Sequence, residues 1–390
     1  MPTTAPTPAP TPVGTAASAE PTGTGPRGVA DDLLAELPHQ GLTDEWLAQD
    51  VDAWTRRIVR RHFDPDDGSP YWLARAAELP FDPRELTRYD DLVRLGPFPL
   101  DVLRTADPAE LVPKAVRRPL TGRIWESGGT TGAPCRVYYT PDMLVHRGVW
   151  RRWSFLTEGF EPRRRWLHAG PTGPHLIGNG CWEISELYAS LVYGIDMDPR
   201  WIKRLIRGGR LADAGAYTDH LLEQITDVLT HQRVDYLNTT PALFAVLVRR
   251  RPELAAALAG VRLSGTQISP AMYREFTDVL GGGPVGISYG NTFGNAAGLP
   301  YEPHPDLLPY APNYPQVTMA VVDKSDWSRT VGYGEGGQVR LTVLHDDLFL
   351  PNVLERDQAV RYDTGTRWPC DGVANVRPLQ IAQSAPEGLY

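Results

Sequence analysis

The chain has 390 residues, a net charge of −8 and 42% hydrophobic residues, values that are ordinary for a globular protein. This length suffices for one large domain or two ordinary ones, and the acidic balance argues against nucleic acid as the main partner. No apolar run approaches the roughly 20 residues that cross a bilayer, and no secretory signal opens the chain, so we expect no membrane association. The three cysteines, Cys135, Cys181 and Cys370, form no metal or disulfide pattern, which favours a reducing, cytoplasmic setting.

The first part of the sequence predicts a disordered tail followed by helices. Residues 1–28 are rich in Pro, Thr and Ala and carry almost no large apolar side chain, which predicts a disordered tail. We expect a single domain over residues 29–390, with a helical lead-in over residues 29–115. Helical spacing of apolar residues predicts three helices there, over residues 30–37, from Thr43 as N-cap to about His62, and over residues 70–77.

A glycine-rich loop follows the lead-in. The run Glu126-Ser127-Gly128-Gly129-Thr130-Thr131-Gly132-Ala133-Pro134 stands between two short strand patterns, at residues 123–125 and 136–140. Glycines let backbone N–H groups converge on a ligand, and hydroxyl groups add donors, which suits a polyphosphate. No Gly-Lys-Ser/Thr follows, so this is not the P-loop of kinases and GTPases. A plain hairpin turn is the alternative.

Helix and strand patterns alternate in the core, which we assign to residues 116–300. Predicted helices cover residues 217–232, 241–250 and 270–280, and predicted strands cover residues 234–238, 261–264 and 285–289. This alternation predicts an α/β fold in which a parallel sheet is wrapped by helices. The part over residues 301–370 is β-rich, with antiparallel strands expected at residues 317–322, 337–344 and 358–362, and residues 371–390 form a short tail.

Three segments near strand ends suggest a ligand site, because ligands collect beyond the carboxyl ends of parallel strands. The segments are Ser264-Gly265-Thr266-Gln267, Tyr289-Gly290-Asn291-Thr292-Phe293 and Arg361-Tyr362-Asp363-Thr364-Gly365-Thr366. Taken singly, a Tyr-Gly or Thr-Gly pair is a common turn. Their order and spacing after the glycine-rich loop favour one common site.

These segments resemble the motifs of the adenylate-forming enzymes, the superfamily of acyl-CoA synthetases, peptide-synthetase adenylation domains and luciferases. The phosphate loop of that superfamily reads S-G-T-T-G-x-P-K, and Cys135 stands where most members have Lys. Residues 71–77 and 89–93 are also similar to the phenylacetate–CoA ligase branch. The resemblance covers about residues 70–370 and implies the large N-terminal domain of the adenylate-forming fold.

The resemblance implies a site for ATP. The phosphate-binding residues would be Ser127, Gly128, Gly129, Thr130, Thr131, Gly132 and Thr292, with Thr130 and Thr292 as catalytic donors. The adenine side would include Gly265, Thr266, Tyr289 and Gly290, and the ribose would contact Asp363 or Thr366.

Two departures from the family pattern affect the expected chemistry. Phe293 replaces the Glu that helps to hold Mg²⁺, so the metal ligand is unknown, with Glu183, Glu186 and Glu302 as open alternatives. The chain ends soon after the ribose segment, so we expect the family's lysine-bearing C-terminal domain to be absent and the activity to be weak. This chain is similar to short proteins of phenazine-antibiotic biosynthesis, which have the same shortened form without that domain. The acyl-protein synthetases of bioluminescent bacteria are similarly short.

The acid-binding pocket is expected between the strand ends and residues 168–193. His175, Asn179, Trp182 and Phe293 are the candidate contacts for a small, aromatic carboxylic acid. The structural alternatives are a hydrogen-bonded loop histidine and aromatic side chains that belong to the core.

Three functional hypotheses follow. The first is an AMP-forming ligase that activates the acid as an acyl-adenylate for transfer to an amine, a carrier protein or coenzyme A in natural-product biosynthesis. The second is a nucleotide- or acyl-ligand-binding partner protein that has lost catalysis. The third is an acyl-protein synthetase in which Cys370 accepts the acyl group. A second copy of the chain, as a homodimer, is a further candidate partner.

Overall fold

The structure is a computed structural model, and it describes residues 39–129, 132–299 and 306–379. The α-helices are α2 (His39–Leu47), α3 (Val51–His62), α4 (Pro70–Ala76), α5 (Val102–Thr105), α6 (Pro141–Thr157), α7 (Leu176–Leu187), α8 (Pro199–Arg207), α9 (Leu211–His231), α10 (Pro241–Arg250), α11 (Pro252–Ala256) and α12 (Pro270–Val279). Short 3-10 helices are η1 (Pro83–Glu85), η2 (Tyr89–Leu95) and η3 (Pro108–Leu111). The strands are β1 (Ile124–Glu126), β2 (Arg136–Tyr138), β3 (Arg165–Gly170), β4 (Leu191–Asp196), β5 (Tyr236–Thr239), β6 (Gly260–Leu263), β7 (Val285–Gly290), β8 (Asn295–Gly298), β9 (Pro309–Pro312), β10 (Val317–Val322), β11 (Gly336–His345), β12 (Leu348–Tyr362) and β13 (Gly372–Pro378).

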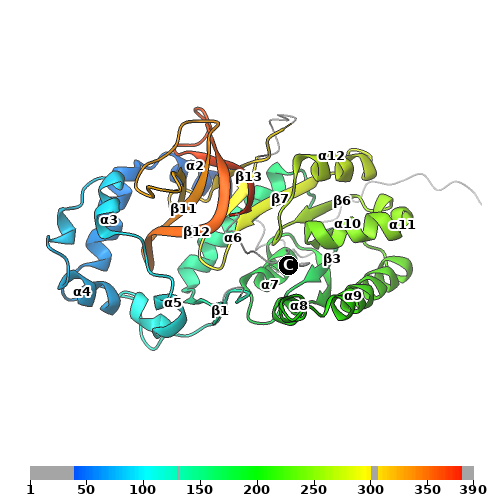
Figure 1. Cartoon of the computed structure of the whole chain (residues 1–390), viewed down its shortest axis with the longest axis horizontal. Coiled ribbons are helices and arrows are strands. Elements are labelled where there is room, and N and C mark those ends of the chain that lie inside the picture. The colour runs from blue at the N-terminus through cyan, green and yellow to red at the C-terminus, as the bar shows by residue number, and fades with distance from the viewer. Residues whose placement is uncertain (1–38, 130–131, 300–305, 380–390) are drawn as a thin grey trace, which may run out of the picture.

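One mixed sheet forms the centre of the molecule. Its strand order is β10-β11-β12-β13-β9-β8-β7-β6-β5-β3-β4. The strands from β7 to β4 in this order pair in parallel, whereas those from β10 to β7 pair in antiparallel fashion. Figure 1 shows α8 to α12 gathered at one end, the long strands β11 and β12 in the middle, and α3 and α4 at the other end. The predicted α/β fold class is confirmed, including the change from parallel to antiparallel pairing.

The predicted helix from Thr43 to His62 is wrong in its extent. Thr43 lies inside α2, and a break at residues 48–50 separates α2 from α3. The cause is Asp50, whose carboxylate accepts a hydrogen bond of 2.7 Å from the Ala53 backbone N–H and so caps a new helix. The predicted helix over residues 30–37 lies outside the described residues.

The N-terminal helices pack against the β11–β12 hairpin, although the two regions are far apart in the sequence. The indole N–H of Trp54 donates to the Leu344 carbonyl at 2.8 Å, and that of Trp72 donates to the Phe349 carbonyl at 3.0 Å. All four residues are buried. Because a buried indole N–H needs a hydrogen-bond acceptor, these contacts set the position of α3 and α4 on the hairpin.

His62 connects the same two regions and is held neutral. Its Nδ1 lies 2.6 Å from the Ser69 hydroxyl, and its Nε2 lies 3.0 Å from the His345 carbonyl oxygen. Burial lowers the pKa of His62 to about 4, and the nearby Arg61 contributes in the same direction.

We therefore expect the free energy of unfolding to decrease as the pH falls from about 6.5 to about 4. Over this range the unfolded chain binds a proton at His62 that the folded chain does not bind, so acid favours unfolding. Denaturant titrations across the range measure this slope. His62→Gln is expected to reduce it, whereas His231→Gln at an exposed position of α9 should leave it unchanged. A slope that His62→Gln does not alter would contradict the assignment.

Among the described residues, no helix combines the length and the apolar character needed to cross a membrane.

Candidate active site

A cavity of about 260 Å³ opens at the carboxyl ends of the parallel strands, and we call it the main cavity. Its walls come from the glycine-rich loop, the first turn of α7, the ends of β5, β6 and β7, and the middle of β12. The lining residues are Glu126, Ser127, Gly128, Arg147, Arg151, His175, Leu176, Ile177, Asn238, Arg262, Ser264, Gly265, Ser288, Gly290, Asn291, Thr292, Asn295, Glu355, Arg356 and Asp357. Segments separated by more than half of the chain thus meet in one place.

The glycine-rich loop is closed at its base by two hydrogen bonds. The Ser127 backbone N–H donates to the Cys135 carbonyl at 2.9 Å, and the Cys135 backbone N–H donates to the Ser127 hydroxyl oxygen at 2.9 Å. Gly129 has a φ angle of 61°, a value that L residues with a side chain rarely adopt. Cys135 is buried, and burial raises the pKa of its thiol, so it offers no cation at the position where the S-G-T-T-G-x-P-K motif that the loop resembles has Lys. The predicted contacts Thr130 and Thr131 lie outside the described residues.

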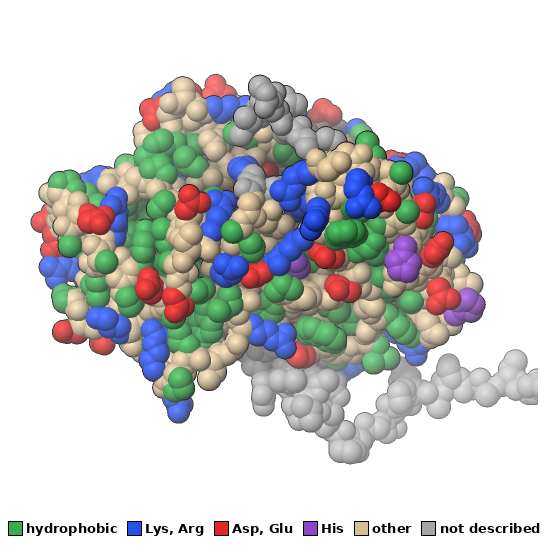
Figure 2. All heavy atoms as spheres, turned by 60° about the horizontal axis from the view of Figure 1, so that its bottom comes forward, with side chains coloured by type: hydrophobic (Ala, Val, Ile, Leu, Met, Phe, Trp, Pro, Cys, Tyr) green, Lys and Arg blue, Asp and Glu red, His purple; other side chains and the backbone are tan. Residues whose placement is uncertain are grey.

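A second hollow, which we call the arginine cleft, borders the later residues of the loop. Its volume is about 510 Å³, and Gly129, Gly132 and Pro134 meet Arg200, Arg204 and Arg207 of α8 there. The spacing of these arginines places them on one face of the helix. Figure 2 turns this side of the molecule forward and shows Lys and Arg side chains gathered near the middle of the face. The surroundings of the loop therefore favour an anion.

The segment after β7 contributes the turn at the edge of the main cavity. The Asn291 side-chain oxygen accepts hydrogen bonds from the backbone N–H groups of Phe293 and Gly294, both at 2.9 Å. The Thr292 carbonyl accepts a hydrogen bond of 2.8 Å from the Tyr139 hydroxyl, and the Thr292 hydroxyl has no partner within the described part of the chain. The turn is thus fixed by its neighbours, and no described residue takes up the Thr292 hydroxyl.

The predicted adenine side is brought to the cavity in part. Gly265 and Gly290 line the main cavity. Tyr289 lies behind this wall, and its hydroxyl donates to an Asp357 carboxylate oxygen at 2.9 Å. Thr266 does not line the cavity, and its hydroxyl oxygen is buried without a hydrogen-bond partner among the residues described.

The predicted ribose contacts are not brought to the cavity. Asp363 and Thr366 are exposed in the turn between β12 and β13, where the Asp363 carboxylate accepts a hydrogen bond from the Gly365 backbone N–H at 2.8 Å. Glu355, Arg356 and Asp357, from the same strand, line the main cavity instead. The sequence signal that was missed is a charged run inside a strand whose first half, over residues 348–353, is buried.

Glu355 and Asp357 form a half-buried acidic pair beside the turn after β7. Glu355 accepts a hydrogen bond of 2.6 Å from the Asn291 amide. Burial raises the pKa of Glu355 to about 8, and the charge of Asp357 adds to the increase. Burial also raises the pKa of Asp357. Two neighbouring half-buried carboxylates, of which Asp357 disfavours the charge of Glu355, suit a divalent cation, whose charge would relieve the repulsion.

The predicted acid contacts are separated by the fold. His175 lines the main cavity, and its Nδ1 lies 3.1 Å from the Glu126 carbonyl oxygen. Asn179 instead donates to a Glu183 carboxylate oxygen at 2.8 Å, and Trp182 is 54% exposed on the outer side of α7. Phe293 is buried in the hydrophobic core and faces a different, small cavity. Neither Trp182 nor Phe293 therefore contributes an aromatic wall to the main cavity.

Two of the three carboxylates proposed from sequence as replacements for the missing metal ligand, Glu183 and Glu186, do not line the main cavity. Glu183 is held by Arg147 and Arg151, at 3.2 Å and 2.5 Å. Glu186 is exposed on α7, and Glu302 lies outside the described residues. The acidic pair of β12 takes this place as the candidate.

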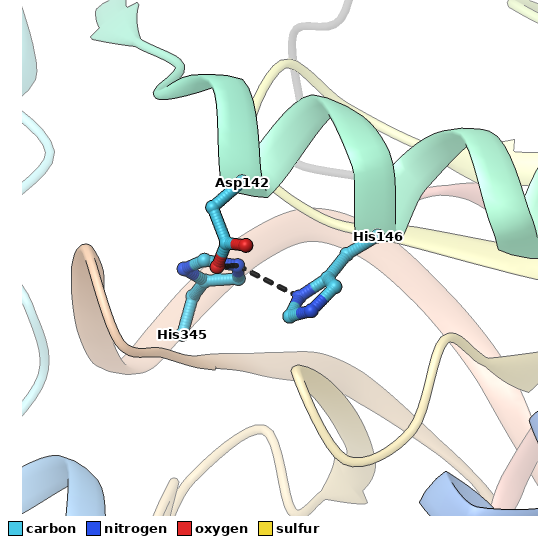
Figure 3. A group of neighbouring side chains, drawn as sticks. All are labelled: Asp142, His146 and His345. Carbon is cyan, nitrogen blue, oxygen red and sulfur yellow. Dashed lines mark hydrogen bonds and ion pairs between the residues drawn. The ribbon is translucent and has the colours of Figure 1, made fainter. Parts of the chain in front are cut away.

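Figure 3 shows a separate group, Asp142 and His146 on α6 with His345 at the end of β11. The His345 Nδ1 accepts a hydrogen bond of 3.0 Å from the Asp347 backbone N–H, so the neutral ring carries its proton on Nε2. That Nε2 lies 2.9 Å from the His146 Nδ1, which is then the acceptor. Both facing nitrogens are occupied by this chain of hydrogen bonds. The arrangement therefore favours a structural contact over a metal site.

Cys370 does not line the main cavity and packs against the cluster that contains Trp46, Trp150 and Trp368. Burial raises the pKa of its thiol. A half-buried thiol that stays protonated is a poor nucleophile, so this environment disfavours Cys370 as an acyl acceptor.

Three crystal structures of 2-hydroxyisobutyryl-CoA ligase are similar to this structure. The complex with 2-HIB-AMP and CoA in the thioesterification state has a TM-score of 0.61 and 13% sequence identity, over 84% of this chain and 67% of that chain. The open conformation with the same ligands has a TM-score of 0.59 and 12% identity, over 83% and 67%. The postadenylation state with R3-HIB-AMP has a TM-score of 0.58 and 13% identity, over 83% and 65%.

The chain has the fold of an acyl-CoA ligase. At this level of identity the similarity establishes the fold and leaves the activity to the site itself. The chain spans about two thirds of the length of those ligase chains. No family model and no curated protein matches the sequence.

Proposed function

We propose that this protein activates a small carboxylic acid with ATP, forming an acyl-adenylate and pyrophosphate. The observation that carries the proposal is that the glycine-rich loop and the ends of β6 and β7 surround one cavity in the fold of an acyl-CoA ligase. Structures of that ligase contain 2-HIB-AMP and CoA, which supports the same class of reaction here.

In the proposed reaction a carboxylate oxygen attacks the α-phosphate of ATP, and pyrophosphate leaves from the opposite side. Positioning and electrostatic stabilisation are sufficient, and no covalent intermediate with the protein is needed. The Thr292 hydroxyl would donate to an α-phosphate oxygen as charge develops there. Ser127 and Gly128 would border the β and γ phosphates, and the arginine cleft would stabilise the leaving pyrophosphate.

The acidic pair Glu355 and Asp357 fits Mg²⁺, because carboxylate oxygens are its usual protein ligands and a second carboxylate stands close by. Bound Mg²⁺ would neutralise phosphate charge. Under this proposal the metal ligand has moved from the position of Phe293 to β12.

A Glu355→Gln variant tests the metal proposal. The amide keeps the size of the side chain but cannot ionise to hold the cation, so we expect the affinity for Mg²⁺ in the presence of ATP to fall by at least about 10- to 100-fold. Calorimetric Mg²⁺ titrations measure the affinity, and pyrophosphate exchange measures the metal dependence of the reaction. Glu186→Gln makes the same change on the exposed side of α7 and should have no effect. Identical titration curves for Glu355→Gln and the wild type would remove Glu355 from the metal site.

Exchange of labelled pyrophosphate into ATP, measured with a panel of small acids, tests adenylation itself. We expect acid-dependent exchange and trapping of the adenylate by hydroxylamine. The transferred group would then pass to coenzyme A, an amine or a carrier protein, which product analysis with each acceptor distinguishes. A place in the phenylacetate–CoA ligase-like branch and in natural-product biosynthesis, and an aromatic acid as substrate, are predictions from the sequence that this panel also tests.

A nucleotide-binding protein without catalysis is the second candidate. This function is favoured by Cys135 and Phe293, which stand at the positions where the motifs of the adenylate-forming enzymes have Lys and Glu. Calorimetric binding of ATP without pyrophosphate exchange for any acid would support this function over adenylation.

A further inference from the structure

A row of polar residues crosses the parallel sheet beneath the main cavity. His168 of β3, Asn238 of β5 and Arg262 of β6 are neighbours in the strand register, and each is at most 5% exposed. The next position in the row is Gly286 of β7, where a Cβ atom would lie 2.5 Å from a Glu158 carboxylate oxygen. Strands buried on both faces are normally rich in Val, Ile and Leu, so this row is a departure that needs a cause.

Arg262 of this row meets two arginines of α6, Arg147 and Arg151; Arg147 and Arg262 are buried, and the Arg151 side chain is 12% exposed. Arg147 and Arg151 share the Glu183 carboxylate. Arg262 pairs with Glu158, its Nε lying 3.1 Å from the carboxylate oxygen, and also donates to Ser154 at 3.2 Å. Three guanidinium groups therefore face two carboxylates, which leaves one positive charge without a counterion in this cluster.

The excess positive charge faces the space where a ligand would lie. Arg147, Arg151 and Arg262 line both the main cavity and an adjoining cavity of about 40 Å³, which we call the lower cavity. The acidic residues of the main cavity, Glu126, Glu355 and Asp357, do not line the lower cavity. The two signs of charge are thus segregated, with the basic groups at the end that the two cavities share.

Arg151 is the member of this cluster with the most unused hydrogen-bonding capacity. Its Nε lies 2.5 Å from Glu183, but neither terminal nitrogen has a hydrogen-bond partner among the described residues. The Arg151 guanidinium packs against Gly180 of α7. A Cβ atom added to Gly180 would lie 2.6 Å from Nη1 and 2.7 Å from Nη2 of Arg151. A planar guanidinium with two free terminal nitrogens matches a carboxylate in bidentate fashion.

We propose that the acid activated by this protein carries a second anionic group, such as a second carboxylate, which pairs with Arg151 at the shared end of the two cavities. This inference rests on the proposed function, since it takes the main cavity to be the site of the acid. It replaces an apolar aromatic pocket with a basic one as the determinant of specificity. The first carboxylate would point toward Thr292, and the second would supply the missing negative charge of the arginine cluster.

Pairs of acids that differ only in the second charge test the proposal. Succinate with butanoate, glutarate with pentanoate, and terephthalate with 4-methylbenzoate are compared by calorimetric binding in the presence of ATP and Mg²⁺, and by pyrophosphate exchange. A buried, charge-assisted pair contributes enough to predict a preference of about 10- to 100-fold for the dianion in at least one pair. Equal or stronger binding of the monoacid in every pair would overturn the inference.

Three variants show whether Arg151 is the cause. Arg151→Met is expected to remove the preference for the dianion, and Arg151→Lys to retain part of it. Gly180→Ala should also reduce the preference, because the added methyl group displaces the guanidinium. Arg152→Met is the matched control, since Arg152 is the next residue of α6 and lines neither cavity. A full preference in both Arg151→Met and Gly180→Ala would overturn the role of Arg151.

The two measurements separate this inference from the proposed function. Calorimetry measures binding without turnover. An absence of pyrophosphate exchange for every acid would therefore count against adenylation but not against the second anionic group. Faster pyrophosphate exchange with the monoacids than with the dianions would support adenylation and overturn the inference of a second anionic group. If Arg151→Met does not fold, the wild-type comparison and Gly180→Ala still decide the outcome.

Discussion

A Thr292→Val variant is expected to lose about 10²- to 10³-fold of the pyrophosphate exchange rate while its thermal stability stays close to that of the wild type. Valine keeps the shape of threonine but lacks the hydroxyl that would donate to the developing phosphate charge. The backbone at this position is held by the hydrogen bond from the Tyr139 hydroxyl to the Thr292 carbonyl, which valine preserves. The variant therefore removes one donor and leaves the turn in place.

The control for this experiment is Thr218→Val, the same change on α9, where the hydroxyl only bonds to the Ala214 carbonyl of its own helix. That variant should exchange pyrophosphate at the wild-type rate. Thr292→Val with an unchanged rate would remove its hydroxyl from the reaction and would weaken the assignment of the turn after β7 to the α-phosphate.

A Glu158→Leu variant is expected to lose about 3–5 kcal/mol of the free energy of unfolding. The carboxylate of Glu158 is buried and pairs with the buried guanidinium of Arg262, at 3.1 Å. Removing one partner leaves the other charge unpaired in a medium of low polarity, and this costs more than the pair itself contributes. Denaturant unfolding followed by circular dichroism measures the loss.

The double variant Glu158→Leu with Arg262→Leu separates the two causes. Removing both charges should restore most of the lost stability, because two apolar side chains can replace a buried ion pair at small cost. A double variant that is no more stable than Glu158→Leu would mean that packing around Phe155, over which the Arg262 guanidinium lies at 4.7 Å, dominates instead.

Much of the α/β core could be predicted from local sequence patterns. The helices that become α10 and α12 each begin with Pro after a Thr or Ser that caps them, as the sequence indicates. The short β-branched runs become β5, β6 and β7 with boundaries shifted by at most two residues. The glycine-rich loop lies between two paired strands, β1 and β2, as expected. These features depend on interactions between residues close together in the chain.

The site could be predicted only in part. Gly128, Gly265, Gly290 and Thr292 line the main cavity because each lies within two residues of the end of a strand, at β1, β6 or β7. Asp363 and Thr366 were expected there by resemblance, but the same strand brings Glu355 and Asp357 to the cavity instead. The strand is β12, with 15 residues, and its pairing with β11 and β13 decides which of its residues reach the cavity. A local sequence pattern does not predict the register of that pairing.

The sequence by itself determined the alternation of helices and strands over residues 217–289, the parallel sheet that this alternation implies, and the position of the glycine-rich loop, because short-range hydrogen bonding, capping and hydrophobic periodicity act within a few residues. Only the tertiary structure decided that Phe293 is a core residue, that Trp182 faces outward and that Arg151 borders the main cavity. The physical reason is that burial and charge environment are set by contacts between distant segments. Those contacts exist only once α6, α7 and the sheet have packed together.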